Sequence, residues 1–380
     1  MPRITFVLRL ALLLAGGLLA ACSTPSPVTA PPAGTPPDSK AALPEVAVAQ
    51  KLRVVAVGDM MLGTDFPINR LPDEGDPGLL DAMQPVLQRA DVTFGNLEGT
   101  LMDGGEPVKT CQRRDRCYLF RSPSRFAVQL QQAGFDVLSL ANNHARDFGE
   151  KGRSASMQAL DALAIHHSGR RGDVASWQVK GRRLALVAFA PFKNSHDMIN
   201  LTSARDRVAS LAQDHDIVIV SMHAGAEGAE AAHVPFKTEF YYGENRGDVV
   251  AFAHAVIDAG ADLVIGHGPH VPRALELYRG RLVAYSLGNF CTYYGISVSG
   301  NKGLAPVLEV DVDGEGQFLD GRIISARQVR PRGPLPDTSQ AAAHRIKSLT
   351  ESDFPDTLLR ISNNGKIQRR QANKSALAGE

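Results

Sequence analysis

The sequence lacks a charge imbalance, an internal repeat and a hydrophobic run long enough to span a membrane. Its 41 lysine and arginine residues nearly balance 40 aspartate and glutamate residues, so the overall charge favours neither a nucleic-acid partner nor a polybasic membrane surface. Of its 380 residues, 44% are hydrophobic and 21% charged, which excludes disordered, collagen-like and coiled-coil proteins. We expect one globular domain with flanking segments, whose partners are determined by local sites.

The longest hydrophobic run covers residues 10–21 and follows the basic residues Arg3 and Arg9. It is shorter than the roughly 20 residues of a transmembrane helix and is typical of a signal peptide. It ends in Leu-Ala-Ala-Cys, which resembles a bacterial lipobox. We therefore expect residues 1–21 to be a lipoprotein signal peptide and Cys22 to carry the lipid. An ordinary secretory signal with a chance cysteine is the alternative. Ser23 after the cysteine implies the outer membrane, in a cell that has one.

Residues 22–50 are rich in proline, alanine, serine and threonine and predict a lipid-anchored tether from the membrane. A folded domain is expected over residues 51–330, and a C-terminal extension over residues 331–380. Exported proteins can hold disulfides, and Cys111 and Cys117 flank a short loop that such a bridge would close. Cys291 then remains as a small apolar residue, and the cysteine spacing does not suggest a metal site.

Hydrophobic periodicity predicts strands alternating with helices, which indicates an α/β core with added antiparallel hairpins. The expected strands are 52–57, 91–94, 136–140, 216–221, 262–265 and 282–285, with hairpins over 176–189, 306–328 and 357–369. The expected helices are 81–90, 124–134, 154–164, 201–214, 247–259 and 339–349.

Metal-compatible side chains follow five of these apolar strands, in loops that contain Gly58-Asp59, Asn96-Leu97-Glu98, Asn142-Asn143-His144, His223 with Glu227, and His267 with His270. In α/β sheets ligands bind beyond the carboxyl ends of strands, so these loops are expected to converge. Carboxylates, amide oxygens and imidazoles suit a divalent ion such as Mn, Zn or Fe. One or two ions are expected, and the carboxylate of Asp59, directly after the first strand, is the candidate to bridge two.

The order of the motifs GDMML, GNLEGTL, ANNHARDFGEKG, HAGAE, GHGPHVPRALE and SLGNF resembles the CapA family of poly-γ-glutamate capsule proteins over residues 52–291. The resemblance implies a metallophosphoesterase-like, four-layer α/β/β/α sandwich. It also implies a role in the synthesis, export or processing of poly-γ-glutamate, with hydrolysis of γ-linked peptide bonds in some relatives.

The phosphoesterase pattern implies Asp59, Asn143, His223 and His267 as metal ligands and His144 as the proton donor to the leaving group. A metal ligand is the alternative role for His144. The sequence differs from the phosphoesterase pattern at three places. Met61 replaces a usual histidine, Asn96 and Glu98 replace a usual aspartate, and His270 comes one residue late in the last motif. Glu98 is therefore expected as a substitute ligand or a general base, and Glu227 as a further candidate for either role. Phosphatase activity is disfavoured.

Asp147 lies three residues after His144 and is expected to orient its imidazole. A carboxylate that only caps a helix or loop is the alternative for Asp147. The loop between the cysteines is strongly basic, and Arg113, Arg114 and Arg116 are expected to bind an anionic polymer. A solvated surface hairpin is the alternative for that loop. Asn289 is expected either as a structural residue or facing the substrate.

Three functions remain open from the sequence. The first is an envelope metallohydrolase that acts on a γ-glutamyl or other amide-linked polymer. The second is a metal-binding, non-catalytic assembly or export factor that docks the polymer or a capsule synthase, and the third is a phosphoesterase. The expected partners are the anionic polymer, the membrane through Cys22 and a capsule synthase or export complex, with no nucleic acid.

Overall fold

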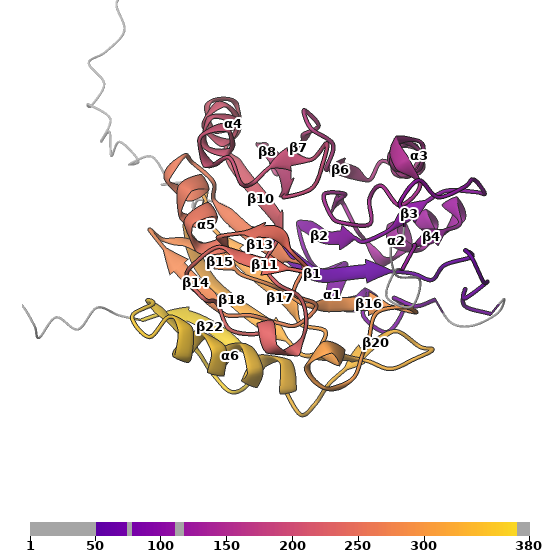
Figure 1. Cartoon of the computed structure of the whole chain (residues 1–380). Coiled ribbons are helices and arrows are strands. Elements are labelled where there is room, and N and C mark those ends of the chain that lie inside the picture. Colours follow the sequence, from indigo (N-terminus) through magenta and orange to yellow (C-terminus); the bar gives the residue numbers. More distant parts are fainter. Residues whose placement is uncertain (1–50, 74–77, 111–117, 371–380) are drawn as a thin grey trace, which may run out of the picture. The chain divides into compact units, whose positions relative to one another are not determined.

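The computed structural model describes residues 51–73, 78–110 and 118–370 (Figure 1). The expected signal peptide (1–21), Cys22, the tether (22–50) and the basic loop with its cysteines (Cys111, Arg113, Arg114, Arg116 and Cys117) lie outside the described residues. Within the described part of the chain, no helix is long and apolar enough to cross a membrane.

The first sheet is built around β1 (Leu52–Met61), which pairs in parallel with β2 (Val92–Leu97) and antiparallel with β17 (Val307–Val312). The strand order is β21-β22-β18-β17-β1-β2-β5-β6, and β16 (Asn289–Thr292) also pairs with β1. The other strands are β5 (Val137–Ser139), β6 (His166–Ser168), β18 (Phe318–Ile324), β21 (Leu359–Ile361) and β22 (Lys366–Arg369).

The second sheet is centred on β10 (Ile217–His223), which pairs in parallel with β8 (Arg182–Ala190) and β13 (Leu263–His267). Its strand order is β14-β15-β13-β10-β8-β7, and β9 also pairs with β8. The other strands are β7 (Ala175–Val179), β9 (His196–Asp197), β14 (Leu275–Tyr278) and β15 (Arg281–Ala284).

The two sheets pack face to face, and their central strands bury side chains on both faces. On β1, Val54 belongs to the cluster shared with Ile219 and Ile265 of the second sheet, whereas Val55 belongs to a cluster with Leu130 on the outer side. Continuous apolar strands of this kind are typical of sheets covered on both faces. Full burial of one such valine or isoleucine contributes about 1.5–3 kcal/mol.

Helices cover the outer faces and complete the four layers. The outer face of the first sheet packs against α1 (Gln84–Leu87), α2 (Ala127–Ala133) and α3 (Gly149–Asp161), and that of the second packs against α4 (Leu201–Asp214) and α5 (Val249–Asp258). This arrangement confirms the expected α/β/β/α sandwich.

Most expected elements form, although the bounds of some helices differ from those expected. The helix expected over 81–90 is reduced to the single turn of α1, which carries Pro85 in its first turn. The expected helix 154–164 instead runs from Gly149 to Asp161, immediately after the loop that carries His144.

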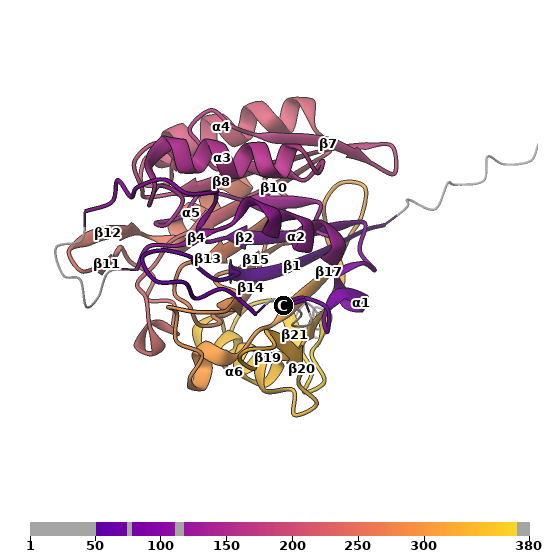
Figure 2. The same ribbon diagram turned by 90° about the vertical axis from the view of Figure 1, so that its right-hand side faces the viewer.

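The boundary expected at residue 330 does not separate two units. The antiparallel pair β21–β22 joins the edge of the first sheet through β18. Helix α6 (Ala341–Asp353) packs against β14 and β18 (Figures 1 and 2), and its Ile346 enters the core between the sheets. The C-terminal segment is therefore part of the same sandwich.

Candidate functional site

Polar side chains from both sheets meet at one edge of the sandwich. In the first sheet, Asp59 of β1 lies in register with Asn96 of β2 and Asn289 of β16. In the second, His223 of β10 lies in register with His267 of β13. Each of the five residues is 0% exposed. The convergence expected from the strand-end motifs is therefore present.

The glycine before Asp59 is required by a close backbone contact. The amide of Asp59 donates a hydrogen bond to the carbonyl of Gly288 at 2.8 Å. A Cβ atom at Gly58 would lie 2.0 Å from that same carbonyl oxygen. The Gly-Asp pair thus lets the loop before β16 approach β1 and fixes the position of the aspartate.

Asp59 is the centre of the hydrogen-bond network. Its Oδ1 accepts from Asn96 Nδ2 at 2.8 Å and lies 3.5 Å from His267 Nδ1, while its Oδ2 lies 3.1 Å from His270 Nδ1. Burial raises the pKa of this carboxyl, but the two histidines outweigh that effect and hold the pKa well below its usual value. Asp59 therefore remains ionised in the interior.

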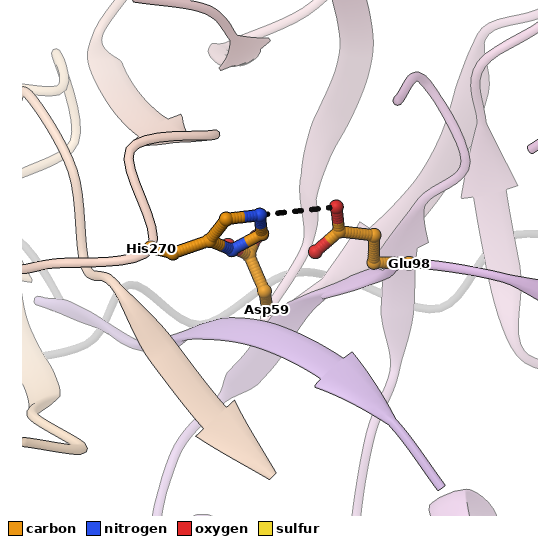
Figure 3. A group of neighbouring side chains, drawn as sticks. All are labelled: Asp59, Glu98 and His270. Carbon is orange, nitrogen blue, oxygen red and sulfur yellow. Dashed lines mark hydrogen bonds and ion pairs between the residues drawn. The ribbon is translucent and has the colours of Figure 1, made fainter. Parts of the chain in front are cut away.

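Glu98 lies opposite His270 and is also buried. Neither carboxylate oxygen accepts a hydrogen bond within the described residues, and burial raises the pKa of the group. Its Oε1 lies 3.7 Å from His270 Nε2 and 3.9 Å from His223 Nε2. Figure 3 shows the His270 ring facing the Glu98 carboxylate, with Asp59 beside them.

These residues fit a divalent metal ion. Asp59, Glu98 and His270 each offer a ligand atom within 4.8 Å of the others. His223 Nε2 and both ring nitrogens of His267 are buried without a hydrogen-bond partner in the described part of the chain. Buried polar atoms are rarely left unpaired, and a set of carboxylates and imidazoles suits a metal of intermediate hardness.

His270 carries a proton when no cation neutralises its neighbours. Burial lowers the pKa of the ring, but Glu98 and Asp59 outweigh that effect and raise the pKa to about 10. Metal binding would displace this proton, because imidazole ligands must be neutral. Nδ1 also lies 3.0 Å from Asn289 Oδ1.

His144 and Asp147 form a second buried pair, on the loop after β5. His144 Nδ1 lies 2.7 Å from Asp147 Oδ2, which also accepts a hydrogen bond from the amide of Phe120 at 2.9 Å. Lys109 Nζ lies 3.0 Å from the other oxygen of Asp147. Burial lowers the pKa of His144, and the Asp147 carboxylate compensates only in part. The structure thus brings together the pair that the three-residue spacing predicts.

Two further predicted residues lie at the site in different settings. The side-chain oxygen of Asn143 is buried and has no hydrogen-bond partner within the described residues, which leaves it free to act as a ligand. Asn289 takes the structural one of its two expected roles. It is fully buried, and its amide donates to the carbonyls of His270 at 3.2 Å and Lys302 at 3.1 Å. Asn289 therefore positions His270.

Two residues that hold the site together had no role predicted from the sequence. Asn142 donates to Asn96 Oδ1 at 3.2 Å and accepts from the amide of His144 at 3.1 Å. Its place beside Asn143 and His144 was a usable signal. Arg246 donates to Glu227 Oε1 at 2.9 Å, and Glu227 Oε2 lies 3.8 Å from His270 Nε2. Nothing local marks Arg246, which lies on β12 (Glu244–Gly247), distant in sequence from the other motifs.

Several bacterial proteins are similar to this chain in sequence. Capsule biosynthesis protein CapA of Bacillus anthracis is 26% identical over 254 residues, which cover 63% of this chain and 60% of that protein. PGA biosynthesis protein CapA of Bacillus subtilis is 25% identical over 273 residues, covering 69% of this chain and 68% of that protein. The match thus spans about three fifths of the length of the Bacillus anthracis protein.

Solved structures that are similar to this chain include a 5'-nucleotidase precursor from Thermus thermophilus, with a TM-score of 0.37, 12% identity and coverage of 80% of this chain and 59% of that chain. The purple acid phosphatase PPD1 from yellow lupin has a TM-score of 0.37 and 12% identity, with coverage of 73% and 54%.

The family model described as bacterial capsule synthesis protein PGA_cap matches residues 53–294. This range includes every strand end that contributes to the site, from Asp59 of β1 to Asn289 of β16. The chain belongs to the bacterial capsule synthesis protein PGA_cap family.

Proposed function

We propose that this protein is a metal-dependent hydrolase that cleaves amide bonds of poly-γ-glutamate or a similar anionic polymer during capsule synthesis, export or processing. The observation that carries the proposal is the buried Glu98 carboxylate, which lies without a hydrogen bond in the described structure beside Asp59, His223 and His270. Family membership and relatives named for capsule and PGA biosynthesis support the polymer class.

The proposed ligands are Asp59, Glu98, Asn143, His223, His267 and His270. A divalent ion such as Mn, Zn or Fe bound there would supply Lewis acidity towards the scissile carbonyl. Asn96 keeps Asp59 in place through the hydrogen bond to Oδ1, and Asn289 orients His270. These two amides therefore position ligands without being ligands themselves.

His144 is the proposed proton carrier. Asp147 holds Nδ1, which leaves Nε2 as the ring atom that accepts a proton from the attacking water and returns it to the leaving nitrogen. Because water adds to the carbonyl carbon while the carbon–nitrogen bond breaks, the products are a carboxylate and an amine. Proton transfer of this kind contributes about 10²- to 10⁴-fold to the rate.

The proposal places the enzyme at the cell envelope. Lipidated Cys22 would anchor the chain, and residues 22–50 would tether the domain to the membrane that exports the polymer. The basic loop with Arg113, Arg114 and Arg116 would contact polymer carboxylates, and a capsule synthase or export complex would be the neighbouring partner.

Metal content and turnover test the proposal together. We expect mass spectrometry of the purified protein to find about one or two equivalents of a transition metal, lost in Asp59→Ala and His223→Ala. His144→Ala should retain the metal and lose cleavage of a γ-glutamyl oligomer. His233→Ala is the matched control, because this histidine is 60% exposed and pairs with Asp353. A parent protein that takes up no Mn, Zn or Fe would refute the proposal.

A second candidate, a non-catalytic polymer-binding factor, is favoured by Met61. This side chain replaces the histidine of phosphoesterases, is 1% exposed, and its sulfur accepts a hydrogen bond from the amide of Gly63 at 3.2 Å. The position that carries a metal-binding histidine in phosphoesterases therefore has no imidazole here, which also disfavours phosphoesterase activity. Metal binding without cleavage of any γ-glutamyl oligomer would identify this candidate.

A further inference from the structure

Two arginines form ion pairs with one glutamate at the beginning of α3, and a third arginine lies nearby on the same helix. Arg146 Nε lies 2.7 Å from Glu150 Oε1, and Arg170 Nε lies 3.2 Å from Glu150 Oε2. Arg153, one turn further along α3, has no carboxylate within ion-pair distance in the described part of the chain, although Glu150 and Asp173 act on it at longer range. Glu150 therefore has to balance several positive charges, and the cluster remains cationic.

Arg153 is the unusual member of this cluster. The residue is 1% exposed, and its Nη1 donates to the carbonyl of Asn194 at 2.7 Å. Its Nε and Nη2 have no hydrogen-bond partner within the described residues. Burial lowers the pKa of this guanidinium to about 10, against the effect of Glu150. A buried guanidinium with unused N–H groups is costly, and its geometry matches a carboxylate that accepts two hydrogen bonds.

The cluster borders the catalytic loop. Arg146 lies two residues after His144, and Arg170 follows β6, which pairs with β5 and contacts α3 (Figure 1). The side chains of Arg146, Arg170 and Glu150 are 30%, 35% and 41% exposed. The outer side of the cluster is thus open to solvent, whereas Arg153 is buried on its inner side.

We propose that Arg146, Arg153 and Arg170 form a carboxylate-binding subsite in which Glu150 occupies the place of a substrate carboxylate. Glu150 is 41% exposed, although its Oε1 also accepts a hydrogen bond from Asn194 Nδ2 at 3.2 Å. Once that bond breaks, the side chain can rotate outward while the incoming carboxylate takes over the contacts with Arg146 and Arg170. The inference rests on the proposed function for the identity of the ligand. In a γ-linked glutamate polymer each residue keeps a free α-carboxylate, so a subsite of this kind would hold one unit of the polymer next to His144.

Binding of a fluorescently labelled γ-glutamyl oligomer to the full-length protein tests the subsite. Arg170→Gln should weaken binding about tenfold, as expected for loss of a charged hydrogen bond. Glu150→Gln should tighten binding about three- to tenfold, because it removes the competing carboxylate and its negative charge. Both effects should shrink at high salt. Arg153 is left unchanged, because removing a fully buried side chain would endanger folding.

Lys151→Gln is the matched control. Lys151 is exposed on the same helix and makes no ion pair in the described part of the chain, so loss of its charge should change affinity less than about twofold. Circular dichroism and thermal unfolding confirm that each variant is folded.

Arg170→Gln and Glu150→Gln should change the affinity in opposite directions, and this distinguishes a binding site from a structural cluster. If folded Glu150→Gln binds the oligomer no more tightly than the parent, the cluster is structural and the inference is overturned. Thermal unfolding with and without inorganic sulfate provides a second test. If Arg170→Gln abolishes the stabilisation of the fold by sulfate but leaves the affinity for the oligomer unchanged, the site binds small anions and the polymer assignment is overturned. Because binding is measured without turnover, failure of the hydrolase proposal would not by itself remove either effect.

Discussion

Arg273 and Glu239 form a buried ion pair with two parallel hydrogen bonds, from Nη1 to Oε1 at 2.8 Å and from Nη2 to Oε2 at 2.7 Å. Arg273 also donates to the carbonyl of Ala231 at 2.7 Å, and Glu239 accepts from the amide of Ala226 at 2.9 Å. The pair thus links the segment after β13 to β11 (Glu239–Tyr241) and to the loop that carries Glu227. The pair therefore stabilises the loop that carries Glu227 beside the candidate metal site.

Glu239→Gln should therefore lower the free energy of unfolding by about 3–5 kcal/mol, because it leaves the Arg273 guanidinium buried without its counter-charge. Urea unfolding at neutral pH measures the difference. Glu244→Gln is the control, since that side chain is 61% exposed in its ion pair with Arg246 and should cost about 0–1 kcal/mol. Equal decreases in the free energy of unfolding in the two variants would show that the buried pair contributes no more to stability than the exposed one.

Asp147→Asn should reduce cleavage of a γ-glutamyl oligomer about 10²-fold while leaving metal content unchanged, within the range expected for proton transfer. The substitution removes the negative charge that holds His144 Nδ1 at 2.7 Å. Asp103→Asn controls for loss of a carboxylate, because Asp103 is exposed and, within the described residues, accepts hydrogen bonds only from the amide and hydroxyl of Ser124. Undiminished cleavage by Asp147→Asn would exclude a role for the pair in catalysis.

His167 should make stability depend on pH. Burial lowers the pKa of His167, but Asp173 at 3.3 Å and Asp161 at 3.0 Å outweigh that effect and raise the pKa above its ordinary value. A histidine with a raised native pKa contributes stability that is fully present below the unfolded pKa of about 6.5 and is lost as pH rises through the native pKa. The difference in unfolding free energy between the parent and His167→Gln should thus be largest in acid and diminish above neutrality. A difference that stays constant from acid to alkaline pH would contradict this assignment.

Cys291 should be inert in the native protein. The residue is fully buried, and burial raises the pKa of its thiol to about 12, so almost no reactive thiolate is present at neutral pH. Iodoacetamide should alkylate Cys291 only after denaturation, which peptide mass spectrometry detects separately from the other cysteines. Rapid alkylation of the native chain would show that β16 opens.

The ligand candidates could be predicted because their signals are local. Each lies at the end of an apolar strand or in the loop that follows it. The parallel pairing that brings His223 opposite His267 follows from the alternation of strands and helices. Helix α4 likewise has the expected bounds, Leu201–Asp214, with Asn200 accepting a hydrogen bond as its N-cap.

The tertiary contacts of the buried arginines could not be predicted in this way. Arg273 and Glu239 are 34 residues apart in sequence, and Arg153 and Asn194 are 41 apart. Their pairing depends on how loops fold over the sheet edge, which periodicity does not encode. The signal peptide, the lipid on Cys22 and the disulfide between Cys111 and Cys117 stay predictions.

The in-register ends of β10 and β13 also constrain how this site can change by insertion or deletion. Successive side chains of a strand point to opposite faces, so one residue added to β10 before His223 would turn its imidazole away from His267. Insertions and deletions are tolerated in the loops outside the sheet, such as the segment between Glu227 and β11. Members of this family should therefore vary in loop length after these strands, while the spacing within each strand up to its histidine stays fixed.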